Sequence, residues 1–105
     1  MIKVTKDNFE SEVLKSDAPV LVEFWAGWCP YCRRLAPAIA QLEEKLSGTV
    51  KVCGVNEDDD PELEDKYGVE LIPTLILFRG GVPGEKLVAA KSLDEVERWL
   101  RAQGA

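Results

Sequence analysis

The chain has 105 residues, of which 46% are hydrophobic and 30% charged, so we expect one folded domain spanning residues 1–105. Its net charge of -6 disfavours nucleic acid and anionic membranes as partners, because both are themselves negatively charged. The longest nearly apolar run, LIPTLILF, is too short to cross a membrane, and the segment MIKVTKDNFE has no apolar stretch of the signal-peptide type. We therefore expect a cytoplasmic protein.

The N-terminal part of the sequence predicts a strand, a helix and a second strand. Residues 2–4 have the content of a short edge strand, and a helix follows as far as Lys15. Asp7 and Glu10 are spaced as the two partners of a capping box, so we expect them at the start of this helix. The run PVLVEFW at residues 19–25 is apolar except for one acid, and its β-branched and aromatic content indicates a buried strand.

A longer helix should follow and carry two neighbouring cysteines at its start. Its apolar side chains recur at spacings of four and three, which predicts one buried stripe: Leu35, Ile39, Leu42 and Leu46. Pro30 suits the first helical turn, where its missing N–H costs little, whereas Pro37 lies in the interior and should kink the helix. Ser47-Gly48 is typical of a helix end.

The C-terminal half predicts three more strands and two more helices. In chain order they are a buried strand at residues 50–56, a short helix from Asp60-Pro61 to Tyr67-Gly68, strands at residues 74–79 and 85–89 joined by a Gly-Gly turn, and a last helix with Ser92 and Glu95 as its capping box. Because strands and helices alternate, we expect an α/β fold with a central mixed β-sheet and helices on both faces. Its antiparallel part should be the hairpin formed by the last two strands.

The stretch WAGWCPYCRRLAP leaves three interpretations of Cys29 and Cys32 to compare. A structural zinc site needs about four ligands, and the chain offers one further cysteine, Cys53, and no histidine. A structural disulfide across so short a loop would add little stability. The third interpretation, a dithiol that cycles with a disulfide, is favoured because the pair follows a predicted strand and opens a predicted helix. Cys53 lies inside a predicted strand, where we interpret it as an inert buried thiol, with a regulatory thiol as the alternative.

The two neighbouring thiols should differ in protonation. Cys29 is expected at the helix N-terminus, where unpaired backbone N–H groups and the helix dipole stabilise a thiolate. Cys32 should lie one turn further on, face the interior and remain a neutral thiol. Cys29 is therefore the candidate nucleophile, and Cys32 is the candidate second thiol.

Glu23 interrupts an apolar strand, where a charged side chain is costly unless it is paired or protonated. Burial would raise the pKa of Glu23, which would suit the carboxyl group to exchange a proton near neutral pH. The alternative interpretation is that Glu23 points to solvent at a sheet edge.

Several segments in this order resemble the thioredoxin family over nearly the whole chain: VLVEFWAGWCPYC, Pro37 in the helix, DKYGVELIPTLILF, the Gly-Gly turn and the capped last helix. The resemblance implies the thioredoxin fold and the activity of a protein-disulfide reductase. It implies that Cys29 forms a mixed disulfide with a client protein, which Cys32 then resolves. It also implies a monomer without bound cofactor or metal, whose electrons come from a thioredoxin reductase linked to NADPH or ferredoxin.

The resemblance also places client contacts around an exposed sulfur of Cys29. The residues concerned are Trp28, Pro30, Tyr31, Ile72, Pro73 and Ala89, with the stretch Val88–Ala90. Pro73 matches the family's cis-proline, although a proline at a strand start is also compatible with a trans bond. Ile72 is implied to pair with an extended client segment. Glu23 matches the family's buried acid below the second cysteine, which implies that it relays the proton of Cys32.

Four positions depart from the family's usual pattern. Pro30-Tyr31 replaces Gly-Pro between the cysteines and is similar to the glutaredoxin motif, so we expect a redox potential about 30 mV or more above the thioredoxin value of about −270 mV. Glu23 replaces an aspartate, as in disulfide isomerases. Gly54 stands where many members have a lysine next to the acid, which should make the acid harder to ionise. Ala89 replaces a glycine, and its methyl group should narrow the range of clients.

Two other functions stay open at the level of the sequence. The CPYC motif is similar to that of glutathione-linked oxidoreductases, but the glutathione-binding TVP and GG-D features of glutaredoxins are not visible, and IPT stands instead. A thioredoxin-like domain can also be a binding subunit without turnover, an interpretation that the presence of both cysteines weakens.

Overall fold

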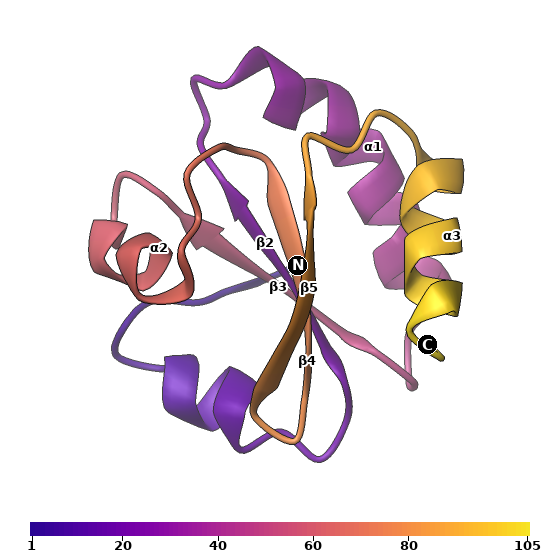
Figure 1. The fold of residues 1–105 in the computed structure, drawn as a ribbon, viewed down its shortest axis with the longest axis horizontal. Helices are drawn as coiled ribbons and strands as arrows, with labels where there is room; N and C mark the ends of the chain where they lie inside the picture. The colour runs from indigo at the N-terminus through magenta and orange to yellow at the C-terminus, as the bar shows by residue number, and fades with distance from the viewer.

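The computed structural model describes residues 1–105 and consists of a five-stranded sheet with helices on both faces (Figure 1). The strands lie in the order β1-β3-β2-β4-β5. Their bounds are Ile2–Lys3 for β1, Val20–Trp25 for β2, Lys51–Asn56 for β3, Thr74–Arg79 for β4 and Val82–Val88 for β5. Strands β1, β3 and β2 run parallel, whereas β4 is antiparallel to β2 and β5 is antiparallel to β4. The expected α/β fold with a central mixed sheet is confirmed.

The direction of β4 differs from the expectation that only the last hairpin would be antiparallel. Strand β3 ends and β4 begins beside the C-terminal end of β2, since Asn56 pairs with Trp25 and Thr74 pairs with the neighbouring Phe24. The helix between them, α2 (Pro61–Tyr67), has 7 residues and is therefore about 10 Å long. A parallel return would have to cover the length of a six-residue strand, about 20 Å. Because α2 is short, the chain re-enters the sheet at the end where it left, and β4 therefore runs antiparallel to β2.

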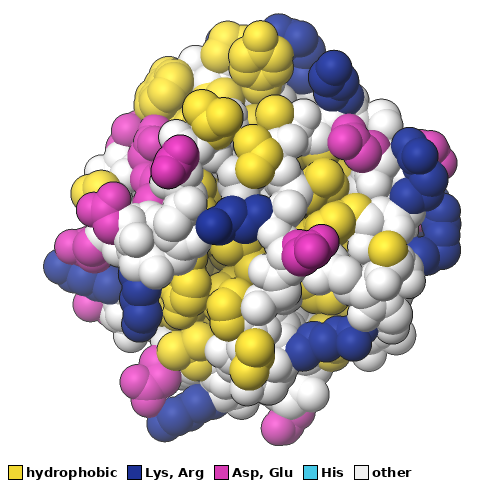
Figure 2. All heavy atoms as spheres, viewed as in Figure 1, with side chains coloured by type: hydrophobic (Ala, Val, Ile, Leu, Met, Phe, Trp, Pro, Cys, Tyr) yellow, Lys and Arg dark blue, Asp and Glu magenta, His cyan; other side chains and the backbone are white.

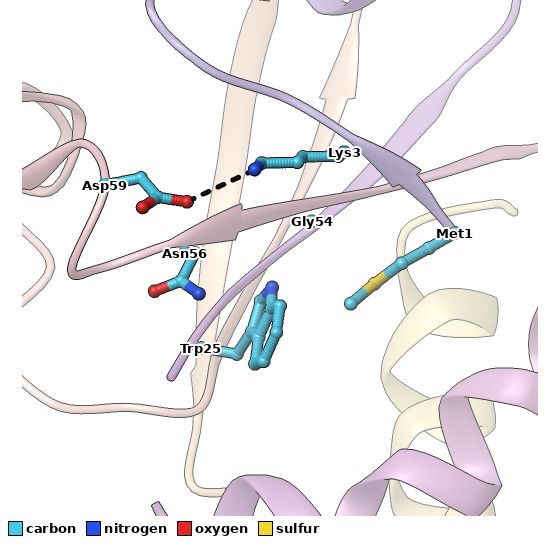
Figure 3. A pocket seen from close by; sticks show the side chains of 6 residues that line it. All are labelled: Met1, Lys3, Trp25, Gly54, Asn56 and Asp59. Atoms are coloured by element: carbon cyan, nitrogen blue, oxygen red, sulfur yellow. Dashed lines mark ion pairs between the residues drawn. The ribbon is translucent and has the colours of Figure 1, made fainter. Parts of the chain in front are cut away.

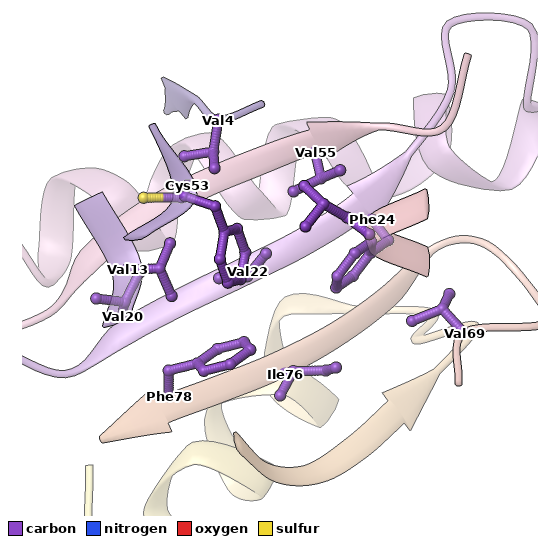
Figure 4. Packing of buried hydrophobic residues seen from close by; sticks show 12 residues of the cluster. Val4, Val13, Val20, Val22, Phe24, Cys53, Val55, Val69, Ile76 and Phe78 are labelled. Atoms are coloured by element: carbon purple, nitrogen blue, oxygen red, sulfur yellow. The ribbon is translucent and has the colours of Figure 1, made fainter. Parts of the chain in front are cut away.

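The helices divide between the two faces of the sheet. Helices α1 (Pro30–Lys45) and α3 (Leu93–Ala102) cover one face, and α2 with the π-helical segment η1 (Glu10–Leu14) covers the other (Figure 1). Each face has its own cluster of buried side chains. Figure 4 shows the cluster on the α2 side, which is made largely of aliphatic and aromatic side chains from β2, β3 and β4. No helix is both long and apolar enough to span a bilayer.

Alternation along β2 decides where its acid points. Successive side chains of a strand face opposite sides of the sheet. Val22 and Phe24 belong to the cluster on the α2 side, whereas Leu21 belongs to the cluster under α1 and α3. Glu23, two residues after Leu21, therefore lies on the α1 side of the sheet, the side on which Cys32 also lies.

The first helix is capped differently from the prediction. Phe9 is the residue before η1 and makes no side-chain cap, so the capping box expected from Asp7 and Glu10 is wrong. Instead, the Asn8 side chain accepts a hydrogen bond of 2.7 Å from the backbone N–H of Thr5 and so orders the turn that leads into η1.

The last helix has the predicted cap. The Ser92 hydroxyl accepts a hydrogen bond of 3.1 Å from the backbone N–H of Glu95. The carboxylate of Glu95 reaches back to the backbone N–H of Lys91 at 2.8 Å, one residue before the partner that a capping box predicts. Both bonds fix the point at which the chain enters α3 after β5.

Candidate active site

The two neighbouring cysteines lie where β2 leads into α1. Cys29 is the N-cap of α1, Pro30 is its first residue, and the helix continues past Pro37 to Lys45. Both cysteines are free thiols, and the backbone N–H of Cys32 donates a hydrogen bond of 3.2 Å to the sulfur of Cys29. The first turn of α1 has no acidic side chain. The sulfur of Cys29 therefore lies at the start of the helix, where it accepts one of the backbone N–H groups that have no partner within the helix.

Both sulfurs are covered in this dithiol state. The exposed fraction is 3% for Cys29 and 5% for Cys32, so the expected exposure of the Cys29 sulfur is wrong. Ile72 packs against the cluster that contains both cysteines, and the Cys29 sulfur lies 3.9 Å from the carbonyl oxygen of Ile72. A client disulfide must displace this cover before its sulfur can reach Cys29.

Cys32 has the environment of a neutral thiol. Burial raises the pKa of Cys32 to about 12, and its hydrogen bond with Cys29 acts in the same direction. The thiol therefore keeps its proton at neutral pH. It can react only if a neighbouring group accepts that proton during the reaction.

Glu23 provides such a group. Its exposed fraction is 3%, so the alternative in which Glu23 points to solvent is wrong. Burial raises the pKa of Glu23 to about 7, and the nearby N-terminal ammonium group opposes this rise to a smaller extent. One of its carboxyl oxygens, Oε2, has no hydrogen-bond partner. Glu23 and Cys32 both line a cleft of about 290 Å³ between α1 and the sheet, large enough for several water molecules.

Met1 fills the space that a side chain at position 54 would need. A Cβ atom on Gly54 would lie 2.7 Å from the terminal carbon of Met1, 2.8 Å from its sulfur and 3.0 Å from the indole nitrogen of Trp25. Figure 3 shows Met1 and Trp25 on either side of Gly54. The ammonium group of Met1 is paired with Glu43 at 2.7 Å. Position 54 therefore offers no cation to Glu23, which agrees with the raised pKa of that acid.

The loop before β4 lies against the cysteines and is tied to the end of β5. The bond between Ile72 and Pro73 is cis, as the resemblance implied. The Pro73 carbonyl accepts a hydrogen bond of 2.8 Å from the backbone N–H of Ala89. Ala89 has a φ of 53°, in the left-handed region where a Cβ atom is crowded, which explains why glycine suits this position.

A group of exposed hydrophobic side chains surrounds the start of α1. We call Trp28, Tyr31, Leu71 and Val88 the apolar rim. Their exposed fractions are 60%, 60%, 64% and 44%, and Figure 2 shows hydrophobic side chains gathered at this end of the molecule. Leu71 was not predicted from the sequence as a member of this group, although its position directly before Ile72 was an available signal. Trp28, Tyr31 and Val88 lie where the resemblance placed client contacts.

Cys53 lies away from this site. It is completely buried in β3 and belongs to the cluster on the α2 side of the sheet. Burial raises the pKa of Cys53 to about 11, so its thiol stays protonated at neutral pH. This environment agrees with an inert thiol. The structure contains no group of three or more His, Cys, Asp or Glu side chains arranged to hold a metal ion.

Comparison of the sequence with a family model and with known proteins shows which family the chain resembles. The family model described as Thioredoxin matches residues 1–102. A thioredoxin of Rickettsia bellii is 44% identical over 97 residues, which cover 92% of this chain and 92% of the relative. Thioredoxin 1 of Nostoc sp. is 44% identical over 88 residues, 84% of this chain and 82% of the relative. A thioredoxin of Pseudomonas aeruginosa is 40% identical over 102 residues, 97% of this chain and 94% of the relative.

The chain belongs to the thioredoxin family. Members of this family are thiol-disulfide oxidoreductases, and this relationship gives the chain the role of a protein-disulfide reductase. Thioredoxins generally work without a bound cofactor, receive electrons from thioredoxin reductase and act on clients that contain disulfides. The fold and the reduced pair Cys29 and Cys32 agree with that chemistry.

Proposed function

We propose that Cys29 is the nucleophile and Cys32 the resolving thiol of this reductase. The observation that carries the proposal is the 3.2 Å hydrogen bond from the N–H of Cys32 to the sulfur of Cys29. The Cys29 thiolate attacks one client sulfur, the client S–S bond breaks, and the other client sulfur leaves and takes up a proton. Cys32 then attacks the Cys29 sulfur, which releases the second client thiol and leaves a disulfide between Cys29 and Cys32. The client gains two electrons, and the pair loses them.

Glu23 accepts the proton that Cys32 loses in the second step. Support for this role comes from the shared cleft, the unpartnered Oε2 atom and the pKa of about 7, which is close to the pH at which the protein would work. A water molecule in the cleft can carry the proton between the two groups. Once protonated, Glu23 is neutral and suits its buried position.

Clients bind at the apolar rim and along the loop that contains Ile72. Trp28, Pro30 and Tyr31 contact the client on the α1 side, whereas Pro73 and Ala89 contact it from the other side of Cys29. Proline lacks an N–H group, and an extended segment of the client pairs with the backbone of Ile72. Binding of that segment replaces the contact between the Cys29 sulfur and the carbonyl oxygen of Ile72.

The electron donor is a thioredoxin reductase linked to NADPH or ferredoxin. The protein acts as a monomer in the cytoplasm, where a reducing environment favours the dithiol. Reduction of insulin disulfides tests the function when electrons come separately from dithiothreitol, from NADPH with thioredoxin reductase, or from glutathione with glutathione reductase. We expect turnover with the first two donors. Turnover with glutathione as the only effective donor would support the glutaredoxin-like alternative, and none at all would support a binding subunit.

A further inference from the structure

Two aromatic side chains of the apolar rim, Trp28 and Tyr31, each contact a charged side chain. The charge beside Trp28 is negative, and the charge beside Tyr31 is positive. The indole N–H of Trp28 donates a hydrogen bond of 3.3 Å to the carboxylate of Asp58. The guanidinium carbon of Arg34 lies 4.7 Å from the ring centroid of Tyr31. Both rings are exposed to the same fraction, 60%. The rim therefore has a negative charge on the Trp28 side and a positive charge on the Tyr31 side.

Neither charge is neutralised by an ion pair. Arg33, Arg34 and Asp58 are exposed, and none of them belongs to an ion pair of the structure. By contrast, the neighbouring Asp59 is paired with Lys3 at 3.5 Å. The first turn of α1 has no acid that would offset the two arginines. In a chain of net charge -6, this local positive charge is a distinct feature of the site.

We propose that the apolar rim selects client segments that carry an acidic side chain on one side of the reactive cysteine and a basic side chain on the other. The acidic side chain lies toward Arg34 and the basic side chain toward Asp58. The inference rests on the proposed function, since it requires that clients approach Cys29 across the rim. Opposite charges attract and like charges repel, so only one order of the two client charges is favourable.

The size of the effect follows from the exposure of these groups. An exposed ion pair contributes little, and the contribution is screened by salt. The favourable order gains two attractions and avoids two repulsions, so its kcat/KM should exceed that of the reversed order by on the order of tenfold at low ionic strength.

Two peptides of identical composition test the proposal. Each carries one cysteine as a disulfide with a chromogenic thiol; one has Glu before and Lys after the cysteine, and the other has the reverse order. Dithiothreitol supplies the electrons. We expect kcat/KM to differ by on the order of tenfold at low salt and to converge in 0.5 M salt, roughly the range where charges are strongly screened. Equal values at low salt would overturn the proposal.

Substitutions of Arg34 and Asp58 test whether the difference in kcat/KM between the two peptides depends on these two charges. Arg34→Gln and Asp58→Asn remove charge, and the Asn side chain can still accept the Trp28 hydrogen bond. Each should reduce the ratio between the two peptides to about threefold, and the double variant should abolish it. Arg101→Gln and Asp17→Asn, which change exposed charges far from the rim, should leave the ratio unchanged. A ratio that survives the double variant would contradict the assignment. Failure to reduce either peptide would instead contradict the proposed function.

Discussion

The side chains of Glu23 and Cys32 line the same cleft, with a pKa of about 7 for the carboxyl group and about 12 for the thiol. Burial raises both values. The thiol holds its proton too firmly to react unaided, and the carboxyl group changes charge close to neutral pH. The carboxylate of Glu23 is therefore the group placed to accept the proton of Cys32.

Replacing Glu23 with Gln should remove a pH-dependent component of turnover. The carboxylate is the form that accepts a proton, so the rate of insulin reduction by the wild type should rise as the pH increases through about 7. Glu23→Gln should lose this rise and be slower at pH 8. Stopped-flow measurement of the second step between pH 5 and 9 provides the check. An unchanged profile in the variant would exclude Glu23 from the proton route.

The same substitution should change how stability depends on pH. The pKa of Glu23 is about 7 in the folded protein and 4.5 as its unperturbed value, so between these pH values the folded state binds more protons than the unfolded state. The stabilising contribution of the protonated acid is complete below pH 4.5 and is lost as the pH rises to about 7. Glu23→Gln should therefore gain about 2–3 kcal/mol relative to the wild type between pH 4.5 and pH 8. Urea unfolding of both proteins at the two pH values measures this difference, and a constant difference would contradict the assignment.

A lysine at position 54 should make Glu23 easier to ionise. In Gly54→Lys the new side chain must displace Met1, whose terminal atoms lie within 2.8 Å of the Cβ position. Displacement is inexpensive, because these atoms are the flexible end of a side chain. The added cation favours the carboxylate, so the pH midpoint of turnover should move to a lower value. Glu62→Gln, which changes the net charge by the same +1 on exposed α2, serves as the control. A midpoint that stays in place in Gly54→Lys would show that position 54 does not affect the acid.

Glycine at position 89 should stabilise the fold. Ala89 has a φ of 53°, a conformation that costs a residue with a Cβ atom about 1–2 kcal/mol. Glycine removes this cost but gains freedom in the unfolded chain, which offsets about 0.4–1 kcal/mol. Ala89→Gly should thus raise the free energy of unfolding by about 0.5–1 kcal/mol, measured by urea denaturation. A loss of stability of similar size would mean that the methyl group makes packing contacts that outweigh the backbone strain.

Replacing Pro30-Tyr31 with Gly-Pro should lower the redox potential. The intervening pair adjusts the stability of the thiolate and hence of the dithiol relative to the disulfide. We expect the wild type to lie about 30 mV or more above about −270 mV, and the Gly-Pro variant to lie below the wild type. Equilibration of both proteins with defined ratios of reduced and oxidised glutathione gives the two potentials. A wild-type value at or below about −270 mV contradicts the prediction.

Much of this architecture was accessible from local sequence patterns. The acid within the run VLVEFW predicted a buried carboxyl group, because nothing else in that strand is polar and a central strand has no solvent-facing side. The helix start at Cys29 was predictable from Pro30 and from the stripe that follows it. The cis bond before Pro73 came from the family resemblance rather than from the local pattern, since proline at a strand start is compatible with both isomers.

Other features depend on how distant segments meet, and the local pattern did not contain them. The direction of β4 depends on where the chain emerges after α2. The cover over Cys29 depends on Ile72, which is 43 positions away in sequence. The contact of Met1 with Gly54 requires β1 to pair beside β3. The hydrogen bond of Trp28 to Asp58 likewise joins two loops.

The central claim is the division of roles between Cys29 and Cys32, and the variant Cys32→Ser tests it most directly. When the protein is reduced beforehand and mixed with insulin after dithiothreitol has been removed, this variant should stop after the first step and accumulate a mixed disulfide through Cys29, detectable by mass spectrometry. Cys29→Ser should form no such species, and Cys53→Ser should turn over normally. Wild-type turnover by Cys32→Ser, or a client trapped on Cys29→Ser, would contradict the account.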